Sequence, residues 1–327
     1  MLRQPVRRTL LLLCVLLATA TGSYARSPSD PIVVTLLGTG TPDPRADRFG
    51  PSTLVEAGGK KLVFDVGRGA TIRLQQIGVS LGQLTGIFLT HFHSDHTNGI
   101  PDLWLTGWLP PHGARQKAFR VWGPRGTAKL MESLKKAYQA DLDIRMADEK
   151  LPPQGIAVAV TEFARDSVIF DEDGVTVTAF EVDHGKYIKP AYGFKVDYGK
   201  RSVVISGDTR YCENVITHAR GTNLLLHEVA MAPEDVQSSP QIQRILGHHT
   251  LPEEAGRVFA QAKPELAVFT HLALLPGREG VRPSAQDVLA ATRKTYGGRL
   301  EVGEDLMRIV VGETAEVFRF DPAKKGY

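Results

Sequence analysis

The densest group of potential metal ligands in the sequence is the segment His-Phe-His-Ser-Asp-His at positions 91–96. Neutral imidazoles and a carboxylate suit Zn²⁺, and Fe or Mn accept the same donors. A predicted strand runs directly into this segment, so His91 and His93 can grip one metal ion together. Asp95 and His96, just beyond, can turn toward a second ion. A lone histidine is more often a packed or surface residue, but four potential ligands in six positions predict a metal site.

Three further potential ligands, His184, Asp208 and His271, occur singly later in the chain. His184 and His271 are each expected at the end of a strand, and Asp208 follows another strand after a Ser-Gly pair. Each is weak evidence alone, because a histidine at a strand end is more often structural and Gly-Asp is more often a turn. Only their joint order and placement point to a shared site.

The predicted elements that position these residues form hairpins in both halves of the chain. Ser52–Ala57 and Lys61–Asp65 flank a Gly-Gly turn, and Tyr192–Asp197 and Arg201–Ile205 flank Tyr-Gly-Lys. Strands and helices alternate afterwards, ending with a helix at Ala285–Tyr296. Hairpins followed by alternation in each half predict two β-sheets faced by helices in one domain.

The first 25 residues have the layout of a secretory signal peptide. Three arginines precede the leucine-rich run Leu10–Ala18, and Ser23-Tyr24-Ala25 offers small residues where a signal peptidase cuts. The run is shorter than the ~20 apolar residues that span a bilayer. We therefore expect a signal peptide at 1–25, a single domain at 26–327 in the periplasm or secreted, and no stable membrane span after cleavage. The export route, general or twin-arginine, stays open.

Charge and cysteine content narrow the classes of partner. The chain has 39 Lys+Arg and 36 Asp+Glu, and residues 1–25 remove three arginines and no acid, so the mature chain is formally neutral at 36 against 36. Nucleic-acid affinity rests largely on clustered Lys and Arg that neutralise phosphates, so this balance argues against a nucleic-acid partner. Only Cys212 survives cleavage, which excludes an intramolecular disulfide.

The segment at 91–96 resembles the HxHxDH motif of the metallo-β-lactamase superfamily, and the later motifs follow the family order. The resemblance covers roughly residues 32–312 and implies an α/β fold, the αββα sandwich. It also implies two Zn²⁺ ions, with Fe or Mn compatible. One ion would be held by His91, His93 and His184, the other by Asp95, His96 and His271, and Asp208 would bridge them.

Within the superfamily, three segments resemble ribonuclease Z and its arylsulfatase-like relatives: Leu36–Pro42, Leu226–Glu228 and Gly247–Thr250. The resemblance implies that Glu228 and His248 cooperate in proton transfer to the leaving group, and that Asp95 orients the nucleophile. Two alternatives stay open here. Glu228 could form a structural salt bridge, and His249 rather than His248 could face the site.

The sequence also departs from ribonuclease Z, because only 23 residues separate His184 from Asp208. Those enzymes carry a longer insert there, with a basic, proline-containing loop that meets tRNA. Together with neutral charge and predicted export, this predicts a binuclear hydrolase of small-molecule esters, sulfate esters or phosphodiesters ahead of lactones. The alternatives are a ribonuclease Z-type tRNA 3′-endonuclease, a β-lactam hydrolase and a metal-binding protein without activity. The intact ligand set argues against the last, and a homodimer is compatible with the sequence.

Two tryptophans that follow the histidine segment have two interpretations. Trp104 and Trp108 could line an apolar pocket for an aryl or alkyl group of the substrate. They could equally pack a helix against the sheet.

Overall fold

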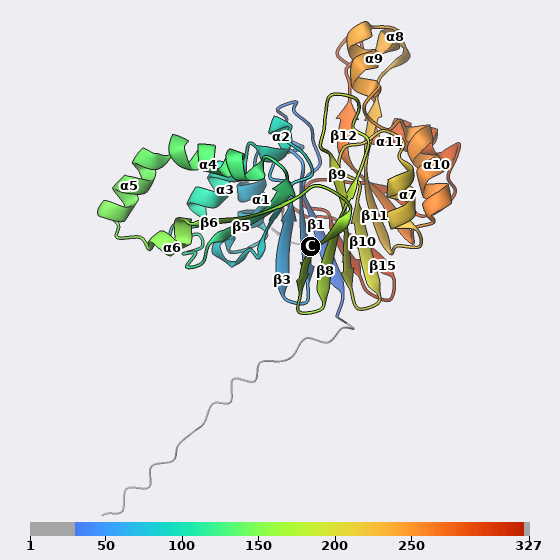
Figure 1. Ribbon diagram of the computed structural model, residues 1–327. Helices are drawn as coiled ribbons and strands as arrows, with labels where there is room; N and C mark the ends of the chain where they lie inside the picture. The colour runs from blue at the N-terminus through green and yellow to red at the C-terminus, as the bar shows by residue number, and fades with distance from the viewer. Residues whose placement is uncertain (1–29, 324–327) are drawn as a thin grey trace, which may run out of the picture.

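Two β-sheets lie face to face between two groups of helices in the computed structural model, which describes residues 30–323 (Figure 1). The predicted signal peptide at 1–25 lies outside the described residues. The eight-stranded sheet has the order β15-β14-β1-β2-β3-β4-β5-β6, and the seven-stranded sheet has the order β13-β12-β11-β10-β9-β8-β7. This arrangement confirms the predicted αββα sandwich.

The eight-stranded sheet contains the predicted N-terminal hairpin, preceded in the chain by a further strand, β1. The pairs β1–β2 and β2–β3 are antiparallel, whereas β3, β4, β5 and β6 run parallel to one another. Its strands are β1 (Ile32–Gly38), β2 (Ser52–Ala57), β3 (Lys60–Phe64), β4 (Gly86–Phe88), β5 (Phe119–Pro124), β6 (Val158–Phe163), β14 (Arg308–Val311) and β15 (Ala315–Phe318).

The seven-stranded sheet is antiparallel through β7, β8, β9 and β10 and parallel from β10 through β13. Its strands are β7 (Ser167–Glu172), β8 (Val175–Glu181), β9 (Tyr192–Tyr198), β10 (Arg201–Ile205), β11 (Leu224–Met231), β12 (Leu266–Leu274) and β13 (Leu300–Val302). The carboxyl ends of parallel strands meet at one edge, where ligand-binding loops of α/β sheets gather. Residues that follow β10, or lie near the ends of β11 and β12, are therefore neighbours.

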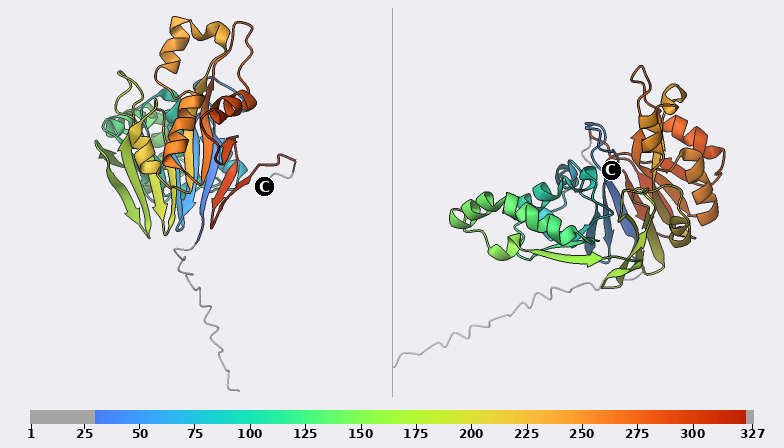
Figure 2. Two further views of the ribbon diagram at one scale, coloured as in Figure 1. Left: turned by 90° about the vertical axis from the view of Figure 1, so that its right-hand side faces the viewer. Right: turned by 45° about the horizontal axis from the view of Figure 1, so that its top comes forward.

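The helices form the two outer layers, with one group on each sheet. Figures 1 and 2 show α1 to α6 beside the eight-stranded sheet, α7, α10 and α11 beside the other, and α8 and α9 projecting beyond the sheets. They are α1 (Ala70–Gln76), α2 (Ser94–Thr97), α3 (Ile100–Thr106), α4 (Thr127–Ala137), α5 (Gln139–Ala147), α6 (Pro153–Ile156), α7 (Glu213–Ala219), α8 (Glu234–Gln237), α9 (Pro240–Leu246), α10 (Pro252–Ala262) and α11 (Ala285–Arg293), with a 3₁₀ turn, η1, at Leu81–Gln83. Within residues 30–323, no helix has the length and apolarity that crossing a membrane requires.

The core between the sheets is apolar and rich in aromatic rings. Phe64 and Phe88 of the eight-stranded sheet meet Phe194 of the other, with ring centroids 5.2 and 6.1 Å from it. Phe88 also stacks on Trp122 at 4.7 Å. Burying such rings removes large apolar areas from water and fixes the two sheets against each other.

Trp104 and Trp108 belong to the layer between helix and sheet, so the substrate-pocket interpretation is wrong. Both side chains are buried among the apolar residues under α3. Their indole N–H groups donate to the carbonyl oxygens of Ile156 and Pro152, each at 3.0 Å. A tryptophan with its ring packed and its N–H satisfied is structural.

Candidate active site

The segment 91–96 follows β4 and leads into the four-residue helix α2, whose first turn carries Asp95 and His96. His91, Asp95 and His96 are buried, and His93 is half-buried. The chain turns between β4 and α2, so the ligands before α2 and the ligands within it point toward one region.

The structure brings all seven predicted ligands into one cluster. Two groups offer ligand atoms within 4.8 Å of one another: His91, His93, His184 and Asp208 in the first, and Asp95, His96 and His271 in the second. These groups correspond to the two sets that the family resemblance implied.

Asp208 occupies the centre of this cluster. Its Oδ2 atom lies 3.2 Å from Nε2 of His271 and 3.3 Å from Nε2 of His96. The same oxygen lies 3.5 Å from Nε2 of His184 and 3.9 Å from Nε2 of His91. Asp208 therefore reaches both groups of histidines and stands where a bridging carboxylate is required.

A glycine turn holds Asp208 in place. Gly207 has φ +61°, and a Cβ atom there would lie 2.4 Å from the carbonyl oxygen of Tyr192. Only glycine combines this left-handed conformation with so close a backbone approach. Ser206, just before it, accepts a hydrogen bond through Oγ from the Glu228 backbone N–H at 3.1 Å.

The sequence predicted that His271 ends a strand, and this prediction is wrong. The strand β12 (Leu266–Leu274) continues past it. Thr270 pairs with Glu228 and Leu272 pairs with Val229, which leaves His271 as the extra residue of a β-bulge. Its φ of +43° is uncommon for a residue with a side chain. Bulges re-aim side chains beside active sites, and here the bulge turns His271 into the cluster.

Other buried groups fix the orientation of the imidazole rings. His184 Nδ1 contacts the carbonyl oxygen of His248 at 2.8 Å, and His91 Nδ1 contacts Thr90 Oγ1 at 2.9 Å. Such contacts leave Nε2 free to bind a metal ion. Burial lowers the pKa of His184 to about 3 and the pKa of His91 well below its usual value, which favours the neutral ligand form.

Asp65 completes this outer layer, and sequence reasoning missed it. One carboxylate oxygen of Asp65 lies 2.7 Å from His96 Nδ1, and the carboxylate accepts hydrogen bonds from the backbone N–H and Oγ1 of Thr90. A buried carboxylate behind a histidine sets its tautomer and raises its basicity as a ligand. The only sequence signal was an acid directly after the apolar end of β3.

The donor set fits metal ions. Nε2 of His91, Nε2 of His96 and Oδ1 of Asp95 are buried and have no hydrogen-bond partner among residues 30–323. Buried polar atoms are normally paired, so a convergent group of unpaired donors calls for a cation. The seven residues therefore suit a binuclear metal site.

Glu228 lies beside the cluster on β11, and its side chain is hydrogen-bonded to the ring of His249, not to that of His248. Its Oε1 atom accepts from the backbone N–H groups of Thr209 and Thr250 at 3.0 and 3.2 Å, and lies 3.0 Å from His249 Nδ1. Burial, followed by the negative charge of Asp208, raises the pKa of Glu228 well above its usual value. A carboxyl group whose pKa is raised is suited to donate a proton.

The two adjacent histidines therefore have different positions. His249 is buried and also groups with Asp208 and His271, so it connects Glu228 to the metal cluster. His248 is half-buried, and its ring centroid lies 5.1 Å from that of His184. The structure pairs Glu228 with His249, the alternative that the sequence left open, and a catalytic role of His248 stays a prediction.

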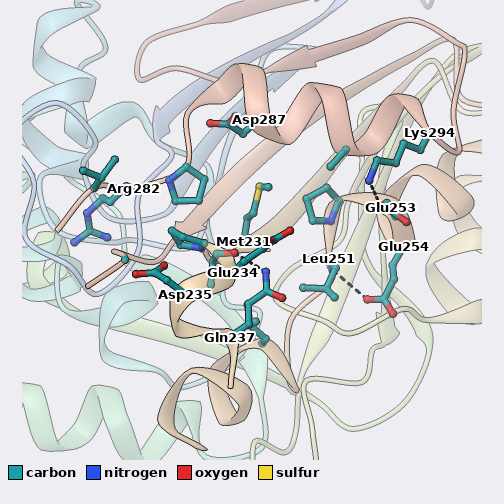
Figure 3. Close-up of a pocket in the computed structure, with 18 of the residues that line it drawn as sticks. Met231, Glu234, Asp235, Gln237, Leu251, Glu253, Glu254, Arg282, Asp287 and Lys294 are labelled. Carbon is teal, nitrogen blue, oxygen red and sulfur yellow. Dashed lines mark hydrogen bonds and ion pairs between the residues drawn. The ribbon is translucent and has the colours of Figure 1, made fainter. Parts of the chain in front are cut away.

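A cavity of about 910 Å³ lies apart from this chemistry (Figure 3). Its walls come from α8, α10, α11 and the loop before α11, and Figure 3 shows Glu234, Leu251, Arg282 and Lys294 around it. None of the seven predicted ligands lines it. A second cavity, about 540 Å³, is lined by Asp183, Arg210 and His249 and adjoins the cluster.

Comparison with known proteins gives the family. Residues 63–272 match the model of the beta-lactamase superfamily domain. The chain is 36% identical over 287 residues to a ribonuclease Z from Mycobacterium marinum, covering 86% of this chain and 99% of that one. It is 37% identical over 287 residues to a ribonuclease Z from Mycobacterium avium, with 86% and 98% covered.

Solved structures agree in fold. The crystal structure of human tRNase Z, short form, superposes with a TM-score of 0.63 at 21% identity, covering 85% of this chain and 99% of that one. The metallo-beta-lactamase fold protein YhfI from Bacillus subtilis gives a TM-score of 0.65 at 20% identity, covering 86% and 100%.

These matches contradict two expectations from the sequence, the exported hydrolase of small esters and the exclusion of nucleic acid as a partner. The relatives that match over nearly their full length are named ribonuclease Z, which was one of the alternatives from the sequence. The charge argument was wrong because it summed the whole chain, whereas phosphate contacts depend on local groups of Lys and Arg. The chain belongs to the ribonuclease Z branch of the metallo-β-lactamase superfamily, whose members are metal-dependent hydrolases acting on ester bonds.

Proposed function

We propose that this chain hydrolyses a phosphodiester bond in RNA, as a ribonuclease Z-type enzyme acting at the 3′ side of precursor tRNA. The observation that carries the proposal is the seven-residue cluster with Glu228–His249 beside it, in a chain 36% identical to a ribonuclease Z over nearly its full length. The cluster supplies hydrolytic chemistry, and the relatives supply the substrate class.

Two divalent ions, which we propose to be Zn²⁺, would be held by the two groups of ligands with Asp208 between them. Imidazole and carboxylate donors suit zinc, and Fe or Mn accept the same set. Bound there, the ions would supply an activated water nucleophile and offset the negative charge of the phosphate.

The chain's own residues would then orient the nucleophile and deliver a proton. Asp95 has an unpaired buried Oδ1 atom and a second oxygen 3.4 Å from His271 Nε2, so it can accept a hydrogen bond from the attacking water. As the new P–O bond forms and the bond to the ribose oxygen breaks, that oxygen takes a proton from the Glu228–His249 pair. The unpaired Oε2 atom of Glu228 leaves the carboxyl group a free oxygen for that exchange.

The test is cleavage of a precursor tRNA transcript with a 3′ trailer, mapped at nucleotide resolution. The wild type should cut at one position near the end of the acceptor stem, and Asp208→Ala should not cut. A transcript without a trailer is the control. Cleavage scattered along the RNA, or none at all from protein supplied with zinc, refutes the proposal.

Export remains a separate proposal that rests on residues 1–25 alone. A three-arginine start before a leucine-rich run supports a signal peptide. Cell fractionation with N-terminal sequencing tests it: a mature chain that begins at Arg26 outside the cytoplasm supports export, and a chain that keeps Met1 in the cytoplasm refutes it.

A further inference from the structure

The loop between β8 and β9 displays an uncovered aromatic ring beside the metal cluster. Tyr187 is 88% exposed, more than any other large hydrophobic side chain in the described part of the chain. It lies three residues after His184, which is completely buried. Three peptide links span at most about 11 Å between Cα atoms, so the Tyr187 backbone lies close to His184.

The two ends of this loop are tied to each other, and its first residues pack against the site. The Val182 N–H donates to the carbonyl of Ala191 at 3.0 Å, and the Gly185 N–H donates to the Asp183 carboxylate at 3.0 Å. Gly185 has φ +101°, and a Cβ atom there would lie 3.1 Å from the Cβ atom of His248. The base of the loop is thus packed against the site, while its tip faces solvent.

The exposed tip is positively charged. Lys186 and Lys189 flank Tyr187 and are exposed, and the Lys186 ammonium lies 5.3 Å from the tyrosine ring centroid. Within residues 30–323, neither lysine forms a salt bridge. The Asp183 carboxylate at the base is already paired with Arg210. A negative ligand would therefore meet two exposed cations on the same loop, of which Lys189 also interacts with the charge of Asp183.

A second aromatic ring lies on the neighbouring ligand loop. Phe92, between His91 and His93, is 37% exposed, and its ring lies 3.3 Å from where a Cβ atom of Gly126 would stand. His93 Nδ1 and His184 Nε2 are 3.4 Å apart, so the two aromatic loops flank adjacent ligands. Phe92 is partly covered, whereas Tyr187 is 88% exposed, with the Lys186 ammonium over one face of its ring.

We propose that Tyr187 is a stacking platform for an unpaired nucleobase next to the scissile phosphodiester, with Lys186 and Lys189 on the flanking phosphates. An exposed aromatic ring between cations is what single-stranded RNA requires: a face for the base and charge for the backbone. The sequence also fits, because the loop is short and holds these groups within four positions. The inference rests on the proposed function, since it names a subsite for that RNA.

The kinetic test compares a precursor tRNA with a small phosphodiester that has no base. Tyr187→Ala should raise KM for the precursor about tenfold, from the energy of stacking one base, with kcat within about twofold. The kcat for bis(p-nitrophenyl) phosphate should stay within about twofold because the metal cluster is intact, and Tyr187→Phe should restore the KM for the precursor. Tyr138→Ala, at another partly exposed tyrosine at the end of α4, is the matched control.

A binding test separates this inference from the proposed function. The probe is a short fluorescein-labelled oligo(A) RNA. Its binding to the full zinc-loaded chain is measured by fluorescence anisotropy. Tyr187→Ala should weaken binding about tenfold. Removing Lys186 and Lys189 should lower the slope of log affinity against log salt by ~0.7 per lysine, and Lys150→Ala should not.

The outcomes are distinct. If the wild type fails to cut precursor tRNA but binds oligo(A) in a Tyr187-dependent way, the proposed function falls and the subsite stands. If Tyr187→Ala binds oligo(A) and precursor within about twofold of wild type, or if the wild type binds no oligo(A) at low salt, the subsite is refuted.

Discussion

Removing the proton donor should slow hydrolysis only where the leaving group needs a proton. Glu228→Gln keeps an acceptor oxygen for the N–H groups of Thr209 and Thr250, so the fold around it should survive. It removes the acidic proton, which typically contributes about 10²–10⁴-fold, or ~3–5 kcal/mol of barrier. His249→Ala should have a similar effect, because it removes the direct partner of Glu228.

The assay is a leaving-group series of phosphodiesters, from activated nitrophenyl esters to alkyl esters, with metal content measured for each variant. Both variants should fail on the alkyl esters and keep most of their rate on the nitrophenyl esters. The Glu228→Gln/His249→Ala double variant should be little worse than either single one, since the pair acts as a unit.

His248→Ala is the matched control, because His248 makes no hydrogen bond to Glu228 through its side chain in the described structure. It should lose much less than His249→Ala on alkyl esters. The reasoning is refuted if His248→Ala shows the large loss and His249→Ala does not, or if all leaving groups slow equally.

Three further predictions concern the metal site. Chelation should abolish activity and lower the melting temperature measured by calorimetry, because bound metal contributes about 2.7 kcal/mol at a hundredfold excess over Kd; an unchanged melting temperature contradicts this. Asp208→Ala should lower activity and zinc content more than any single histidine variant, since its Oδ2 lies within 4 Å of four histidines. Asp65→Asn should weaken zinc affinity about 10–100-fold, with activity restored by added zinc. If added zinc does not restore activity, the role of Asp65 is not to position His96.

The sequence predicted the fold and the ligands because both depend on local patterns. The strands β2 and β10 begin and end at the residues that the sequence predicted, since each is an inner strand with several buried side chains. The HxHxDH segment needs only one strand end and one helix turn to place its donors. Such features are carried by neighbouring residues.

Elements with few buried residues were missed. The strand β7 lies at the edge of its sheet, and its Val168 is 60% exposed while Phe170 is buried. In α5, Leu142 is the one buried residue among those described for that helix. Their positions are decided by pairing and packing partners far away in the chain, which a local apolar pattern does not reveal.

The details of the site also depended on tertiary structure. Asp65 lies 31 positions from His96, so its role was visible only after β3 and β4 were paired. The choice of His249 over His248 follows from how the segment after α9 passes Glu228 on β11. The charge argument failed for a similar reason, since net charge carries no information on where lysines stand.

The binuclear site is tested most directly by anomalous diffraction from a crystal of the full chain grown with zinc. We predict two zinc peaks, one contacted by His91, His93 and His184 and the other by Asp95, His96 and His271, with the Asp208 carboxylate contacting both. A single peak, a peak elsewhere, or Asp208 turned away from either ion would contradict it.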